Sequence, residues 1–184
     1  MSPDQVSEVK GRLVVATPLL ADPNFDHTVV LVLEHSDDGA LGVVLNRPSL
    51  TDVSEALPEW AEMVVPPSQV FVGGPVDRSA IVAVAHSATD EGVEGIAPVA
   101  GRLGVVDLHR GRDHYLGDLD RLRLFAGYAG WGAGQLEAEL EEGSWYLLDA
   151  QADDAFTQEP VELWRAVLQR AGGKLAQLAS APFN

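Results

Sequence analysis

Short runs of apolar residues alternate with polar turns along most of the chain. The run at 28–33 contains only Thr, Val and Leu, without the polar alternation of a half-exposed strand. It therefore predicts a strand that is covered on both faces. Residues 36–39, a turn that ends in glycine, separate it from a second apolar run at 41–45. Two such runs around a short glycine turn predict a β-hairpin.

The same pattern predicts further strands and a few helices. Strands are expected at 13–16, 70–72, 81–85, 103–106, 122–126 and 145–148, and loops at 19–26 and 87–100. Helices are expected at 52–57 with a cap from Ser49 or Thr51, from Gln135 to the glycine at 143, and from Pro160 to 171 with an inner stripe of Val161, Trp164, Leu168 and Ala171. Strands outnumber helices without regular alternation, which favours a mixed α+β class. One domain over 1–184 is expected, with 1–10 and 174–184 as loosely ordered tails.

Charge and composition narrow the classes of partner and site. Acidic residues outnumber basic ones by 28 to 12, for a net charge of −16, so neither nucleic acid nor an anionic membrane is expected as a partner. The absence of cysteine excludes disulfides, thiolate nucleophiles and Cys-ligated metals. No apolar run approaches the ~18 residues of a membrane span, and Pro18 interrupts the apolar segment near the N-terminus that resembles a signal peptide. A cytoplasmic location is expected.

Two stretches resemble binding motifs without matching one. The glycine-rich segment at 127–134 follows a predicted strand, but it has neither the Gly-Lys-Ser/Thr end of a P-loop nor the glycine spacing of a dinucleotide fold. It is interpreted as a tight turn, with Trp131 anchored in the core. Asp107, His109, Asp113 and His114 could supply metal ligands, but Arg110 and Arg112 stand between them, and no metal is expected. Residues 102–123 hold five arginines and net only +1, too little charge for a nucleic-acid site.

The two strands of the predicted hairpin end in polar residues that could bind a ligand. These are Glu34 and His35 after the first strand, and Asn46 and Arg47 after the second. Histidine titrates near neutral pH, and arginine offers a forked donor to a carboxylate or phosphate. The structural alternative is that Glu34 and Arg47 pair with protein groups and fix the hairpin.

The chain resembles the YqgE/AlgH family at these residues and at several longer motifs. The resemblance rests on the segments 11–18, 22–25, 34–35, 39–42, 46–48, 73–76 and 127–137, together with His86, Trp145 and the Trp164 helix. It implies a bacterial cytoplasmic protein with an α+β fold, in which a mixed, bifurcated β-sheet closes into a pseudo-barrel flanked by helices. Some family members carry a transcriptional-regulator label, and the family supplies no catalytic residues to transfer to this chain.

The sequence therefore favours a non-enzymatic binding or regulatory module that binds another protein or a small molecule. The candidate ligand-binding residues are Glu34, His35, Asn46, Arg47, Gly73, Gly74 and Trp131; no catalytic residue is assigned, and no cofactor is expected. The alternative is a hydrolase or nucleotide-handling enzyme that uses the Glu34/His35/Asn46/Arg47 region, and a weaker alternative is a transcriptional regulator. A pocket into which His35 and Arg47 converge would favour the enzyme.

Overall fold

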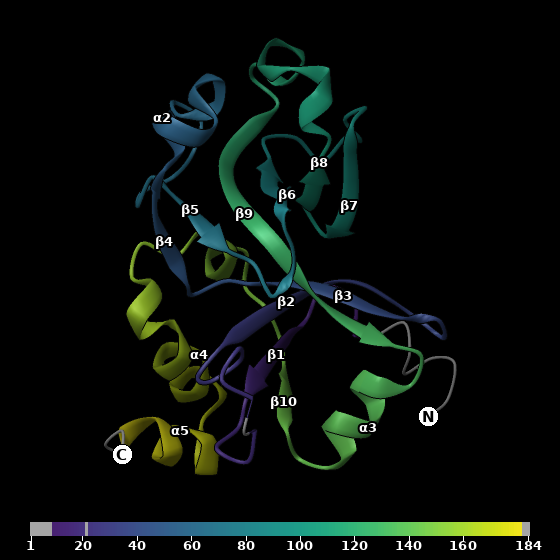
Figure 1. Cartoon of the computed structure of the whole chain (residues 1–184), viewed down its shortest axis with the longest axis vertical. Coiled ribbons are helices and arrows are strands. Elements are labelled where there is room, and N and C mark those ends of the chain that lie inside the picture. The colour runs from purple at the N-terminus through teal and green to yellow at the C-terminus, as the bar shows by residue number, and fades with distance from the viewer. Residues whose placement is uncertain (1–8, 21, 182–184) are drawn as a thin grey trace.

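The longest strand, β9 (Leu119–Gly132), forms the centre of the sheet in this computed structural model, which describes residues 9–20 and 22–181. β6 (Val76–Ser87) pairs antiparallel with most of one edge of β9. The other edge is shared by β5 (Gln69–Val72), which runs parallel to β9, and by β3 (Gly39–Val44), which runs antiparallel to it. The sheet therefore branches at β9, as Figure 1 shows.

The remaining elements extend the two branches and cover them. The strands are β1 (Leu13–Ala16), β2 (Val29–Ser36), β4 (Pro48–Asp52), β7 (Ile96–Ala100), β8 (Leu103–Val106) and β10 (Trp145–Leu148). The α-helices are α2 (Val53–Ala56), α3 (Gln135–Glu141), α4 (Leu163–Ala171) and α5 (Gly173–Ser180), and the 3₁₀ helices are η1 (Pro58–Trp60), η2 (Leu108–Arg110), η3 (Arg112–Tyr115), η4 (Ala152–Phe156) and η5 (Pro160–Glu162). The strand order is β10-β1-β2-β3-β9-β6-β8-β7, with β4 and β5 beside it. The mostly antiparallel, curled sheet with a few helices confirms the α+β class and fits the expected pseudo-barrel.

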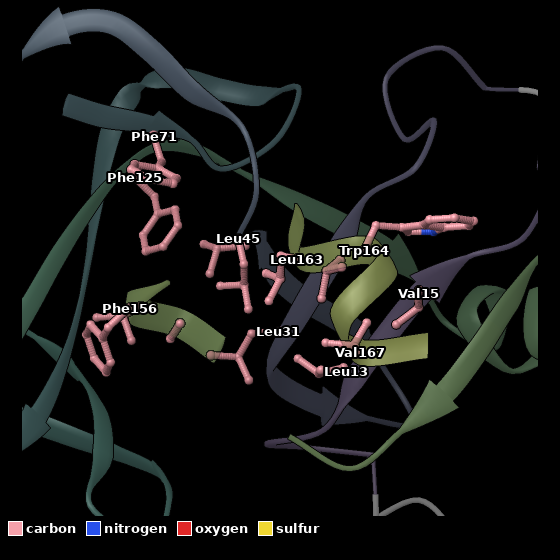
Figure 2. Packing of buried hydrophobic residues seen from close by; sticks show 14 of the residues in the cluster. Leu13, Val15, Leu31, Leu45, Phe71, Phe125, Phe156, Leu163, Trp164 and Val167 are labelled. Atoms are coloured by element: carbon pink, nitrogen blue, oxygen red, sulfur yellow. The ribbon is translucent and has the colours of Figure 1, made fainter. Parts of the chain in front are cut away.

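Strands β1 and β2 are buried on both faces, as their uninterrupted apolar sequence predicts. Successive side chains of a strand point to opposite faces. Leu13 and Leu31 accordingly join the cluster that includes Trp164 and Leu168 of α4, while Val14 and Val30 join the cluster that includes Leu136 of α3. Figure 2 shows the first cluster, in which Leu163, Trp164 and Val167 lie against the strands and Phe71 lies beside Phe125. Because helices cover both faces of β1 and of the apolar part of β2, neither segment has a polar position.

The predicted hairpin of β2 and β3 is confirmed, with an irregularity near its turn. Val30 pairs with Val44 and Ser36 pairs with Gly39, but the register shifts between Val32 and Glu34. Leu33 is the extra residue of this β-bulge, and such a bulge bends its strand and redirects the side chains after it.

Several predicted elements differ from the structure. Residues 96–100 form β7 rather than a loop, and 127–132 continue β9 rather than turn. Residues 48–52 form β4, and Asp52 caps α2 through a 2.8 Å bond from the Ser54 backbone N–H, in place of Ser49 or Thr51. Strand pairing with β8, β3 and β5 is the reason for the first three differences, because it stabilises segments whose own sequence favours turns.

The C-terminal helices also differ from the prediction. Val161 is 81% exposed, and Leu163 and Val167 are buried in its place, because the helix α4 begins only after η5. Residues 174–180, expected as part of a loose tail, belong to α5, which packs against α4 and buries Ala179 completely. Of the expected tails, 1–8 and 182–184 lie outside the described residues. No helix in the described ranges is long and apolar enough to cross a membrane.

Candidate functional site

Asn46 and Arg47 are structural groups that hold the loop before β2. The Asn46 side chain accepts a 3.1 Å bond from the Val29 backbone N–H and donates a 2.9 Å bond to the carbonyl of His27. The Arg47 guanidinium donates to the carbonyls of Pro23, Asn24 and Asp26. Burial lowers the pKa of Arg47, and Asp26 and Asp22 partly oppose this. With its donors directed at backbone carbonyls, the Arg47 fork is occupied by the protein itself.

Gly73 and Gly74 permit a close approach between backbone segments. A Cβ atom on Gly73 would lie 2.3 Å from the Gly127 carbonyl oxygen, and one on Gly74 would lie 2.2 Å from the Tyr128 carbonyl carbon. Both contacts are far shorter than van der Waals distance, so only glycine fits where β5 leaves β9. The space next to Gly73 and Gly74 is therefore filled by the backbone of β9 rather than left open for a ligand.

Glu34, His35 and Trp131 lie together at the turn end of the hairpin. The His35 side chain is 1% exposed, and its Nε2 contacts a carboxylate oxygen of Glu137 on α3. Glu34, the residue next to it along β2, is exposed. Ala40 pairs with both His35 on β2 and Trp131 on β9, which places these two residues on strands either side of β3.

Trp131 is anchored in the core, as predicted, by a carboxylate that the sequence did not single out. The indole N–H groups of Trp131 and Trp145 both donate to Oε1 of Glu139, at 3.0 and 2.9 Å. The other carboxylate oxygen accepts a 3.0 Å bond from the Gln135 side chain. The helical pattern of 135–143 does not reveal this role of Glu139, because the two indoles come from separate strands.

The two ends of the hairpin are far apart. Val29 lies beside Asn46, and His35 follows six residues later on β2, which is a separation of roughly 20 Å for an extended strand. His35 and Arg47 therefore do not converge on one pocket, and each is bonded to other protein groups. The arrangement on which the hydrolase alternative depended is not formed.

A space in the curled sheet has β2 and β3 on one side and β6, β7 and β8 on the other, and we refer to this space as the seam. Within the described part of the chain, β7 pairs with β8 alone. At one end the seam is closed by a contact, because a Cβ on Gly11 would lie 2.6 Å from Cβ of Ala100. Elsewhere the seam holds a cavity of about 210 Å³, lined by Leu33, Leu41, Val82, Ala97, Pro98, Val99 and Val105, with Lys10 and Glu34 at its edge.

The seam cavity adjoins a larger, polar hollow of about 490 Å³. Lys10, Glu34 and Leu41 line both spaces. The polar hollow is also lined by His35, Ser36, Asp38, Gly39, Ala40 and Trp131. Three of the seven predicted residues, Glu34, His35 and Trp131, thus line the polar hollow, and Glu34 also lines the seam cavity. Lys10 and the apolar seam residues were missed, because they come from segments distant in sequence and only the curl of the sheet brings them together.

The arginine-rich stretch at 102–123 is engaged within the protein. Four arginines form ion pairs: Arg102 with Asp90, Arg110 with Glu94 and Asp107, Arg112 with Glu62, and Arg121 with Asp120 and Asp153. The fifth, Arg123, is 1% exposed, donates to the carbonyls of Val65, Pro66 and Thr157 and lies 4.4 Å above the Phe71 ring. Burial lowers its pKa to about 10. That nucleic acid is not a partner stays a prediction.

The Asp107/His109/Asp113/His114 stretch is distributed over two short helices rather than gathered around a point. Asp107 accepts a bond from the His109 backbone N–H at 3.0 Å, and His114 bonds to the Glu94 carbonyl at 2.7 Å. Within residues 9–20 and 22–181, no group of three or more His, Asp or Glu side chains is arranged to hold a metal ion.

Comparison with known proteins identifies the family of the chain. A family model described as AlgH-like matches residues 13–176. A "UPF0301 protein" of Streptomyces avermitilis is 48% identical over 183 residues, covering 97% of this chain and 94% of that protein, and one of Thermobifida fusca is 45% identical, covering 95% and 92%.

Solved structures agree with this identification. A crystal structure of a Corynebacterium diphtheriae protein superposes with a TM-score of 0.88 at 30% identity, covering 95% of this chain and 92% of that one. The solution structure of the AlgH protein from Pseudomonas aeruginosa gives a TM-score of 0.70 at 30% identity, covering 96% and 95%. The chain belongs to the AlgH-like family of UPF0301 proteins.

Proposed function

We propose that this protein is a non-enzymatic binding module for a small amphipathic molecule, and that the seam and the adjoining polar hollow are its binding site. The observation that carries the proposal is that an apolar cavity and a polar one share Lys10, Glu34 and Leu41 as lining residues. Small-molecule sites are typically concave and mostly apolar with a few polar groups, and the mouths of barrels are a common place for them.

The seam accepts the apolar part of the ligand. Its lining side chains are aliphatic apart from Lys10 and Glu34 at the edge, and a cavity of about 210 Å³ has room for a branched aliphatic or small aromatic group. Burial of such a group supplies roughly 25 cal/mol per Å² of apolar surface removed from water. Apolar surface alone thus gives affinity, but it does not select among aliphatic groups.

The polar hollow selects the head group. The exposed ammonium of Lys10 and the exposed carboxylates of Glu34 and Asp38 all line it. One cation and two anions at the end of an apolar slot match a zwitterionic head, with the ligand's carboxylate near Lys10 and its amine near Glu34 or Asp38. The chemistry is that of an amino acid with an apolar side chain, or of a short peptide that begins with one.

The contacts of the titratable side chains support a binding role rather than a catalytic one. His35 contacts Glu137 with its side chain almost fully covered, and Arg47 is held by loop carbonyls at the other end of the hairpin. The groups left at the hollow are two carboxylates and one lysine. They can orient a ligand, and the proposal assigns them no chemical step.

A matched panel of small molecules tests the proposal by thermal shift. L-Leucine carries the apolar group and both charges, leucinamide lacks the carboxylate, N-acetyl-leucine lacks the amine, and glycine lacks the apolar group. Leucine at 100 times its Kd is expected to add about 2.7 kcal/mol, which corresponds to a rise in Tm of roughly 5–11 °C for a chain of this size. The other three compounds should give clearly smaller shifts.

Two substitutions of the same kind on one strand provide the control. Val82→Phe fills the seam, whereas Val76→Phe places the same ring on β6 outside it, at a position already 38% exposed. Binding should be lost in the first variant and retained in the second. A leucine shift that survives in Val82→Phe, or a glycine shift as large as that of leucine, would refute the assignment of the site.

A further inference from the structure

A second and larger cavity lies on the other branch of the sheet. It has a volume of about 700 Å³ and is lined by Ala56, Leu57, Pro58, Glu59, Trp60, Ser79, Ala80, Ile81, Val106, Asp107, Leu108 and His109. Its walls are α2 with η1 on one side and η2 on the other, and its floor is the middle of β6. We call it the β6 groove. None of the residues predicted from the sequence as ligand-binding lines it.

The floor of the β6 groove is an open strand edge. β8 pairs with β6 only as far as the Ala83–Val106 pair, after which the chain leaves the sheet into η2. β6 itself continues to Val76, paired with β9 on its other side. Among the described residues, no strand pairs with β6 beyond Ala83 on the side that faces the groove.

The alternation of backbone groups identifies which residue presents its N–H and C=O to the groove. The Asp107 N–H donates to Gly95 of the β7 side at 2.8 Å. Adjacent residues of a strand direct their backbone groups to opposite sides, so Val106 faces β6 and is opposite Ala83. Two residues further along β6, Ile81 has the same orientation as Ala83. Its N–H and C=O therefore point into the space that β8 has left.

The walls of the groove offer apolar contacts to a chain lying on that edge. Leu57 and Leu108 are partly exposed on the two sides, and the Ile81 side chain is 36% exposed at the floor. Trp60 forms part of the wall and is held from behind by the Tyr115 ring, with 6.2 Å between the ring centroids. A groove with an open strand edge and apolar walls fits an extended peptide that joins the sheet as an added strand.

The charge of the groove indicates the chemistry of that peptide. Glu59 and Asp107 line it, and no Lys or Arg does. Asp107 is partly neutralised by Arg110, 3.6 Å away, whereas Glu59 has no ion-pair partner among the described residues. The net charge of −16 adds a long-range attraction for cations. The acidic side chains of the groove and the net negative charge of the protein therefore both favour a basic segment over an acidic one.

We propose that the β6 groove binds an extended, basic segment of a protein partner by strand addition at Ile81. The backbone of the segment pairs with the N–H and C=O of Ile81, its apolar side chains contact Leu57 and Leu108, and a lysine or arginine pairs with Glu59. This interaction is separate from ligand binding in the seam and does not depend on it.

Hydrogen exchange of the Ile81 amide on the full chain is the decisive measurement. The probe is an eight-residue blocked peptide of alternating lysine and valine, compared with the same peptide carrying glutamate for lysine. The lysine peptide is expected to slow exchange of the Ile81 amide at least tenfold and to shift the NMR signals of residues 57–60, 79–81 and 106–109. The glutamate peptide should do neither at the same concentration.

Charge-changing variants separate strand addition from nonspecific attraction. Glu59→Lys should weaken binding of the lysine peptide by roughly tenfold or more, since a charge-assisted contact becomes repulsive. Glu142→Lys makes the same change at an exposed residue of the α3 region and should leave binding within about twofold. Equal loss in both variants, binding without protection of the Ile81 amide, or no binding at millimolar peptide would each overturn the proposal.

Discussion

The carboxylate of Glu139 should be a main source of the stability of the layer formed by α3 and the β1–β2 strands. Glu139→Leu preserves helix propensity but removes the acceptor for two indole N–H groups at 3.0 and 2.9 Å. Trp131 and Trp145 are only 7% and 3% exposed, so water replaces that acceptor poorly. A hydrogen bond to a charged group contributes about 1.5–3 kcal/mol. Partial access of water to Glu139 reduces the expected loss to about 2–4 kcal/mol in total.

The assay is urea unfolding followed by far-UV circular dichroism, with tryptophan fluorescence as an independent probe. Glu139→Leu should lower the midpoint at unchanged m-value, which indicates a change in stability rather than in the surface exposed on unfolding. Glu139→Gln keeps an oxygen acceptor and should lose only about 1 kcal/mol. The reasoning is wrong if the leucine variant unfolds within 0.5 kcal/mol of wild type, or if glutamine is as damaging as leucine.

Three further substitutions test individual contacts. Gly73→Ala places a Cβ 2.3 Å from a carbonyl oxygen of β9 and should lower the free energy of unfolding by more than about 3 kcal/mol. Gly92→Ala, whose Cβ would have no atom of a described, non-adjacent residue within 4 Å, should leave thermal unfolding unchanged. Similar Tm values for the two variants would contradict the close approach at Gly73. Asn46→Asp removes the donor to the His27 carbonyl and should lower the free energy of unfolding at neutral pH by about 1–3 kcal/mol, with recovery below about pH 4, where a protonated carboxyl can donate. An effect that does not change with pH would argue against this role of the donor. Arg123→Met removes three bonds to carbonyls and should lower the urea-derived free energy of unfolding by roughly 2 kcal/mol, and an unchanged value would show that the cost of burying the charge cancels those bonds.

The sequence predicted the elements whose burial is set by their own residues. The run at 28–33 is apolar throughout, and the structure confirms a strand covered on both faces as well as the hairpin that follows. By contrast, β7 contains Pro98 and the end of β9 contains glycines, so their local sequence favours a loop and a turn. Pairing with neighbours distant in sequence makes them strands, and a single-sequence pattern does not contain that information.

The candidate site was predictable in part for the same reason. Glu34 and His35 were found because they are conspicuous residues next to a predictable hairpin turn, and Trp131 because it stands in a conspicuous glycine-rich segment. All three border the polar hollow. Arg47 has the same conspicuous chemistry, but its bonds are to loop carbonyls, which no pattern of residue types distinguishes from a ligand site. Val82 was missed because an ordinary valine signals a binding surface only when the sheet is seen to curl.

The placement of β9 has a consequence for how the chain acquires its fold during synthesis. β3 completes its pairing only with residues 129–132, β1 pairs with β10 at 145–148, and the Trp164 indole bonds to the Ala16 carbonyl. β1, β2 and β3 can pair with one another early, but β9, β10 and the Trp164 helix are still unmade when these strands leave the ribosome. At ~5–20 residues per second, the strands wait several seconds for these later partners. A topology dominated by such long-range pairing folds in roughly milliseconds to seconds rather than microseconds. Native structure in the N-terminal half is thus expected only after nearly the whole chain has been translated.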